Sequence, residues 1–189
     1  MKVHDDDVKI FDPNNNNKNS EKDDFLAIVD ETNRQRKNGN SEKAKNLGKE
    51  LADLAGDKDL FMSFIKIDDL DPSILEQAYA LMQFSAEAAL NFYLPSTLLS
   101  TIAVNTLQET MILQKNPMYE AALNGSAFSF YYLSVRKGGD QLPYDIGCAF
   151  AMLCGKEGDE HYINVGKRLY LEILKMVEDK IKLLKFAVE

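Results

Sequence analysis

Residues 72–114 decide the fold of this chain, and they read PSILEQAYALMQFSAEAALNFYLPSTLLSTIAVNTLQETMILQ. No charged residue occurs between Glu87 and Glu109, although 28% of the chain is charged. A soluble domain keeps such a segment away from water. Pro95 cannot continue a helix, because its ring clashes with the preceding turn, so it divides the segment into two apolar arms. The stretch therefore predicts a buried central helical hairpin with its corner at Pro95.

The uncharged run from Ala88 to Gln108 is long enough, with 21 residues, to span a membrane. Pro95 and several Asn, Ser and Thr residues interrupt it, however, and no aromatic or basic side chain anchors its far end. A buried soluble hairpin is therefore expected, with no membrane partner. The N-terminus lacks the apolar core of a secretory signal, and the chain has only two cysteines. We expect a cytoplasmic protein with free thiols.

Start and stop signals divide the rest of the chain into helices. The clearest start is Asp71-Pro72, where aspartate caps the helix and proline lacks only an N–H that would have no partner. Further helices are expected to end at Gly39, Gly56 and Gly139. Only residues 8–11 have strand character. The prediction is an all-α fold of seven to nine helices stacked as antiparallel pairs, either an irregular α-solenoid or a helical bundle. Residues 1–22 are expected to form a mobile acidic, Asn-rich tail, and residues 23–189 a single all-helical domain.

Three predicted helices share a phrase in which glycine follows a large aliphatic residue: Leu47-Gly48-x-x-Leu51, Ile146-Gly147-x-x-Phe150 and Val165-Gly166-x-x-Leu169. Glycine inside a helix costs about 1 kcal/mol relative to alanine, so it marks a point where another helix packs closely. The phrase resembles the first helix of tetratricopeptide-type repeats, in which a Leu-Gly pair precedes an aromatic residue and a Gly-Asp turn follows.

This resemblance covers about a quarter of the chain and implies stacked antiparallel helix pairs with a concave, peptide-binding face. The glycines are 99 and 19 residues apart, which differs from the 34-residue period of that family. The alternative is an irregular bundle in which the glycines serve close packing.

Charge and motif content exclude several classes of function. With a net charge of −8, the protein would repel a phosphate backbone, so no nucleic-acid partner is expected. Cys148, Cys154 and His161 lack the paired short spacings of a structural zinc site. The sequence contains no phosphate-binding glycine loop, no nucleophile elbow and no cysteine with an adjacent base. We predict no metal, no cofactor and no catalytic residue.

Two sets of residues are candidates for binding. The first is an aromatic and cationic patch that would contact a protein or peptide partner, because tyrosine and arginine are enriched at binding hot spots: Tyr131, Tyr132, Arg136 and Tyr144. The second set would line a pocket inside the central hairpin: Glu87, Asn91, Asn105 and Glu109. The favoured hypothesis is a non-catalytic protein- or peptide-interaction module. The alternatives are a small-molecule-binding or enzymatic helical bundle, for which the second set is the site, and a structural homo-oligomer.

Overall fold

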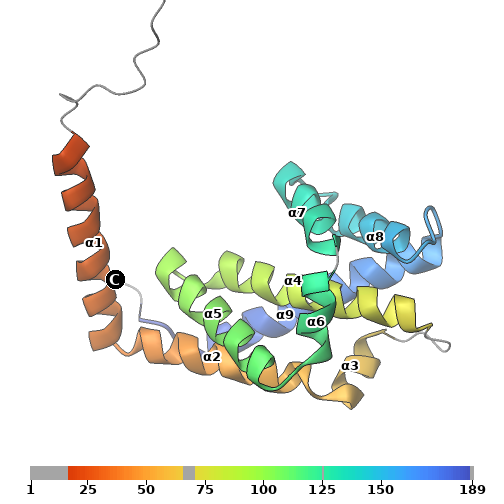
Figure 1. Ribbon diagram of the computed structural model, residues 1–189, viewed down its shortest axis with the longest axis horizontal. Helices are drawn as coiled ribbons and strands as arrows, with labels where there is room; N and C mark the ends of the chain where they lie inside the picture. Colours follow the sequence, from red (N-terminus) through yellow and green to blue (C-terminus); the bar gives the residue numbers. More distant parts are fainter. Residues whose placement is uncertain (1–16, 66–70, 125, 188–189) are drawn as a thin grey trace, which may run out of the picture.

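The computed structural model describes residues 17–65, 71–124 and 126–187, and these ranges are helical throughout except for the connecting turns (Figure 1). They contain no strand and nine helices: α1 (Asn17–Lys37), α2 (Asn40–Ala55), α3 (Lys58–Ile65), α4 (Pro72–Tyr93), α5 (Thr97–Leu113), α6 (Pro117–Asn124), α7 (Ala127–Lys137), α8 (Leu142–Leu153) and α9 (Glu160–Leu184). The prediction of an all-α fold with seven to nine helices is confirmed. Residues 1–16 of the expected tail, with the strand-like segment 8–11, lie outside the described residues, whereas residues 17–22 begin α1.

The predicted helix start at Asp71-Pro72 is confirmed, and a second cap starts the other arm. Asp71 caps α4 by accepting a hydrogen bond from the Ser73 N–H at 2.8 Å, and Pro72 is the first residue of the helix. Ser96 caps α5 by accepting a hydrogen bond from the Leu99 N–H at 3.3 Å. The capping residues therefore fix where the two arms begin.

The two arms diverge from the corner instead of packing along their whole length (Figure 1). α5 packs mainly on α2, and α4 packs mainly on α9 and α6. α2 and α5 run in the same direction, since Gly48 faces Ala103 while Asp53, further along α2, accepts a hydrogen bond from Gln114 at 2.7 Å. Each arm of the hairpin is thus buried by other helices. None of the helices in the described ranges is long and apolar enough to cross a bilayer.

Glycine permits close contacts between helices in this fold. A Cβ added at Gly48 would lie only 2.5 Å from the Ala103 carbonyl oxygen, so the backbones of α2 and α5 touch. The contact between α8 and α9 uses a glycine from each helix: Gly147 packs against the Ile163 carbonyl oxygen, and a Cβ added at Gly166 would lie 2.6 Å from the Phe150 Cβ. The three glycine phrases of the sequence therefore mark close helix packing.

The end of the described chain is tied to the junction of α1 and α2. The side chain of Asn40 is fully buried. Its Nδ2 donates hydrogen bonds to Gln35 Oε1 at 2.8 Å and to the Ala187 carbonyl oxygen at 3.0 Å, and its Oδ1 accepts one from the Ala187 N–H at 2.9 Å. We call this set of bonds the Asn40 clamp. It holds the direction in which α1 leaves the body of the protein, and beyond it Phe25 and Ile28 of α1 are exposed.

We predict that Gly48→Ala lowers the free energy of unfolding by about 2 kcal/mol, even though alanine is ordinarily better than glycine in a helix by about 1 kcal/mol. The added methyl group would overlap the Ala103 carbonyl oxygen and push α2 and α5 apart. Urea unfolding followed by circular dichroism measures the change.

Gly56→Ala is the matched control, because its Cβ would meet its nearest neighbour, the Asp53 carbonyl oxygen, at 3.3 Å. This variant should stay within about 0.5 kcal/mol of the parent protein. A Gly48→Ala protein as stable as the parent would contradict the close α2–α5 contact.

Candidate functional site

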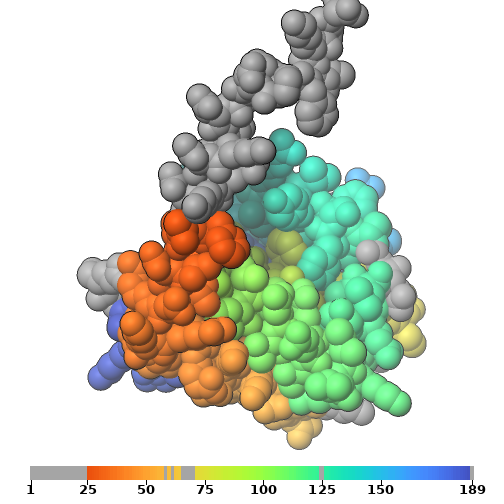
Figure 2. Space-filling view, turned by 60° about the vertical axis from the view of Figure 1, so that its left-hand side comes forward, coloured from red at the N-terminus to blue at the C-terminus, as the bar shows by residue number. Residues whose placement is uncertain are grey.

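An open groove lies between α4 and α7, where two rows of side chains line its walls. The row on α4 consists of residues three or four positions apart, which share one helix face: Phe84, Glu87, Ala88, Asn91 and Phe92. The row on α7 has the same spacing: Phe128, Tyr132 and Val135. The groove has a volume of about 370 Å³. Figure 2 shows α4, in yellow, recessed between α5, in green, and α7, in teal.

Aromatic packing holds α7 against α4 beneath the groove. The Phe84 ring meets the Phe128 ring edge to face, with centroids 5.5 Å apart and an interplanar angle of 87°. Phe84 also packs on Tyr131 at 5.2 Å. Edge-to-face pairs of this kind are worth about 0.5–1.5 kcal/mol beyond the area they bury. The base of the groove is therefore a fixed part of the core, since Phe84 is only 6% exposed.

Glu87 is the single charged residue that lines the groove. Its Oε1 accepts two hydrogen bonds, from Gln83 Nε2 at 2.6 Å and from Gln108 Nε2 at 2.8 Å. Gln83 lies on α4 and Gln108 on α5, so amide groups from both arms orient the carboxylate. No cation in the described part of the chain forms an ion pair with Glu87. Its charge is thus oriented by dipoles and not neutralised.

The structure separates the four residues of the predicted aromatic patch. Tyr131 has no exposed surface and belongs to the core, so it cannot contact a partner in this conformation. Tyr132, the next residue, is 66% exposed and lines the groove. Arg136 is exposed near the end of α7. Adjacent residues on a helix point about 100° apart, which explains the opposite positions of the two tyrosines.

Tyr144 lies in a different hollow, between α7, α8 and the start of α9, with a volume of about 470 Å³. Phe130 and Leu133 of α7 line this hollow, on the side of the helix that faces away from α4. Tyr132 and Tyr144 therefore do not form one surface.

The four residues of the predicted hairpin pocket are also separated. Glu87 and Asn91 line the groove, whereas Asn105 and Glu109 are exposed on α5 and do not. This arrangement does not bring all four to one pocket between the arms, because α5 turns toward α2 and only Gln108 reaches back to Glu87. The groove that receives Glu87 and Asn91 lies on the side of α4 that faces α7.

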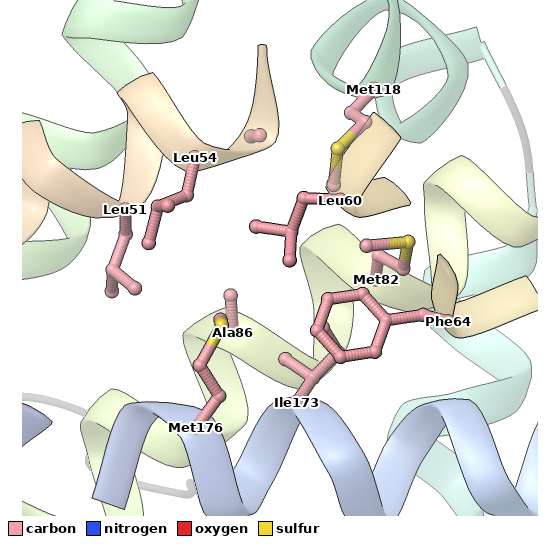
Figure 3. Close-up of a pocket in the computed structure, with 10 residues that line it drawn as sticks. Leu51, Leu54, Leu60, Phe64, Met82, Ala86, Met118, Ile173 and Met176 are labelled. Carbon is pink, nitrogen blue, oxygen red and sulfur yellow. The ribbon is translucent and has the colours of Figure 1, made fainter. Parts of the chain in front are cut away.

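A smaller cavity beneath α3 is a packing defect and does not qualify as a binding site. Leu60 and Phe64 of α3 meet side chains from α2, α4, α6 and α9 around it, including three methionines (Figure 3). Every lining residue is apolar, and the volume is about 30 Å³, which is room for about two water molecules. No polar group there would orient a ligand.

The described residues offer no cluster for a metal ion, and one of the two cysteines is unreactive. Among the described residues, no group of three His, Cys, Asp or Glu side chains is placed to hold a metal ion. Cys148 and Cys154 are both free. Burial raises the pKa of the Cys154 thiol to about 12, so this cysteine is protonated and a poor nucleophile at neutral pH.

Sequence reasoning did not identify Phe84, Ala88, Phe92 and Val135 as site residues. A signal for them existed, since positions 84, 88 and 92 on one helix and 128, 132 and 135 on the other each follow helical periodicity. That signal identifies a face of each helix. It does not say that these two faces meet.

No protein-family model matches the chain, and comparison with curated proteins and with solved structures found no significant match in either set.

We predict that Tyr131→Phe raises the free energy of unfolding by about 1 kcal/mol at neutral pH. The Tyr131 hydroxyl is buried and makes no hydrogen bond to any described residue, and such a group costs about 1–3 kcal/mol. Urea unfolding of the two proteins measures the difference. Tyr132→Phe, which changes an exposed ring next to it, should leave stability unchanged.

Tyr131→Phe should also change how the stability of the protein depends on alkaline pH. Burial raises the pKa of Tyr131 well above the ordinary value of 10.0. The folded state therefore keeps the phenolic proton above about pH 10 while the unfolded chain releases it, so stability is intact below that pH and falls above it. Between about pH 9 and pH 11, the parent protein should lose about 1 kcal/mol more than Tyr131→Phe. Equal losses would contradict a protonated, buried Tyr131.

Proposed function

We propose that the protein is a non-catalytic protein- or peptide-interaction module whose binding surface is the groove between α4 and α7. The observation that carries this proposal is an open, mostly apolar groove with Phe92 and Tyr132 exposed on its two sides. Rigid aromatic side chains give large contact areas at low cost in conformational entropy, and they dominate binding hot spots.

The shape of the groove favours an amphipathic helical partner. Two rows of side chains with helical spacing form its walls, and a helix placed between them would present residues at the same spacing. The partner would then cover Ala88 and pack its apolar face against Phe92 and Tyr132. Burial of this surface supplies the driving force, at roughly 25 cal/mol per Å² of apolar area.

The resemblance to tetratricopeptide-type repeats supports the same kind of function. Two of its three phrases lie in α8 and α9, which pack on each other through Gly147 and Gly166. In repeat proteins of that family, glycine-packed helix pairs build a scaffold for peptide binding. We propose that α8 and α9 play this supporting part here, with α7 placed on α8 and the groove on the far side of α7.

A second candidate is a small-molecule-binding or enzymatic helical bundle. Two observations favour it: a volume of about 370 Å³ falls in the range of small-ligand pockets, and a single oriented carboxylate, Glu87, faces the groove. In this reading the ligand replaces the partner helix.

We also propose a cytoplasmic location, which suits two free cysteines, and a protein partner rather than a nucleic acid, which suits a net charge of −8. A second copy of the chain is one form that this partner could take.

We predict that Ala88→Phe weakens the binding of peptides that the groove recognises. Peptides would be selected on the parent protein from a displayed random library, and their affinities measured by fluorescence anisotropy. The phenylalanine side chain would fill the space beside Phe92 and Tyr132, so the affinity should fall by at least about tenfold.

Leu123→Phe is the control that introduces the same side chain elsewhere, because Leu123 is exposed on α6 and does not line the groove. It should bind as the parent protein does. Selected peptides that bind Ala88→Phe and the parent equally would show that the groove is not the binding surface.

A further inference from the structure

The composition of the groove selects the charge of what it binds. Four aromatic side chains line it, from two helices: Phe84, Phe92, Phe128 and Tyr132. Beside them stands one carboxylate, Glu87, and no lysine or arginine lines the groove. The carboxylate would repel an anion and attract a cation. A cation that reached the face of one of these rings would be attracted by the ring as well.

The carboxylate is prepared for a cation before any ligand arrives. Gln83 and Gln108 hold Oε1 at 2.6 and 2.8 Å, so the group does not need to be ordered on binding. Amide donors orient it without neutralising it, and the described part of the chain gives it no ion pair. The remaining oxygen, Oε2, is the acceptor left for a ligand.

The same hydrogen bonds decide which cation fits. A guanidinium group is bound best by both oxygens of a carboxylate at once, in a planar fork. Oε1 of Glu87 already accepts from two amides, so that fork is not available. An ammonium group is a compact point charge that needs one acceptor and can rest against aromatic faces.

We propose that the groove recognises the ammonium group of a lysine side chain, free or methylated, presented by a protein partner. The lysine stem packs along Ala88 and Phe92, and its ammonium group lies between Oε2 of Glu87 and the Tyr132 ring. This inference rests on the proposed function and names the chemistry of the partner. The net charge of −8 adds long-range attraction for a basic segment.

The first test uses n-butylammonium as a mimic of the lysine side chain and uncharged 1-butanol as its neutral counterpart. Amide chemical shifts in two-dimensional NMR report where each probe binds. We expect n-butylammonium, and not 1-butanol, to shift amides of residues 84–92 and 128–135. Glu87→Gln should weaken this binding by about tenfold, since loss of the ion pair removes about 1.4 kcal/mol.

Matched variants separate the charge of Glu87 from the charge of the whole protein. Glutamine at position 87 can still accept both amide hydrogen bonds, so the fold should be kept. Glu109→Gln makes the same change of charge at an exposed position on α5 outside the groove, and it should bind n-butylammonium as the parent does. Tyr132→Leu, at an exposed position, should weaken binding by removing one ring.

The second test distinguishes a lysine of a protein partner from a free amine. A blocked Leu-Lys-Leu peptide and its norleucine analogue are titrated against the same variants. The lysine peptide is expected to bind more tightly than n-butylammonium and to lose this advantage over norleucine in Glu87→Gln.

Each of the other possible outcomes overturns a specific part of the proposal. If n-butylammonium does not bind, or if Glu87→Gln and Glu109→Gln behave alike, the groove does not recognise ammonium. If the amine binds but the lysine peptide gains nothing over it, the ligand is a small amine and the protein partner is excluded. If peptides bind the groove equally well with norleucine in place of lysine, this inference fails while the proposed function stands.

Discussion

The backbone contact between α2 and α5 at Gly48 is the constraint on which the groove depends. Because a helix can approach Gly48 this closely, α5 packs against α2 and leaves the neighbouring arm, α4, with one flank uncovered. α9 and α6 cover other parts of α4, and α7 then rests on that flank through the Phe84–Phe128 and Phe84–Tyr131 contacts. A hairpin with tightly paired arms would have used the apolar surface of α4 to bind α5. In this fold α4 does not use that surface to bind α5, and the groove is the space that remains.

Local chemistry made part of this fold predictable. Asp71-Pro72 and Ser96 start their helices through side-chain caps that any aqueous chain would form, and the uncharged run between Glu87 and Glu109 marks a segment that must be buried. The packing partners were not predictable in this way. Helical periodicity gives the direction in which a side chain points, but the helix that lies there depends on contacts far apart in the chain. For this reason Tyr131 and Tyr132 looked equivalent in the sequence and differ completely in the fold.

The polar chemistry of the groove depends both on the local sequence and on the packing of helices. Glu87 stood out in the sequence because its neighbours are apolar, yet its orientation depends on Gln108, a residue that only the arrangement of α5 brings near. Three helices therefore define the site: α4 supplies the carboxylate, α5 orients it and α7 supplies the facing aromatic wall. A change in the angle between α4 and α5 would change how Gln108 orients the Glu87 carboxylate and would leave the aromatic side chains of α4 and α7 in place. Charge and apolar contact can thus be varied independently.

The Asn40 clamp has a consequence for the order of folding during synthesis. The side chain of Asn40 finds its last two hydrogen bonds on Ala187, a residue that the ribosome adds 147 positions later. Chains emerge from the N-terminus onward, so α1 and α2 are released long before Ala187 is made. Until then water must take the place of these two bonds, whereas the bond from Asn40 to Gln35 at the end of α1 can already form. The Asn40 clamp is therefore completed only after the whole of α9 has been synthesised.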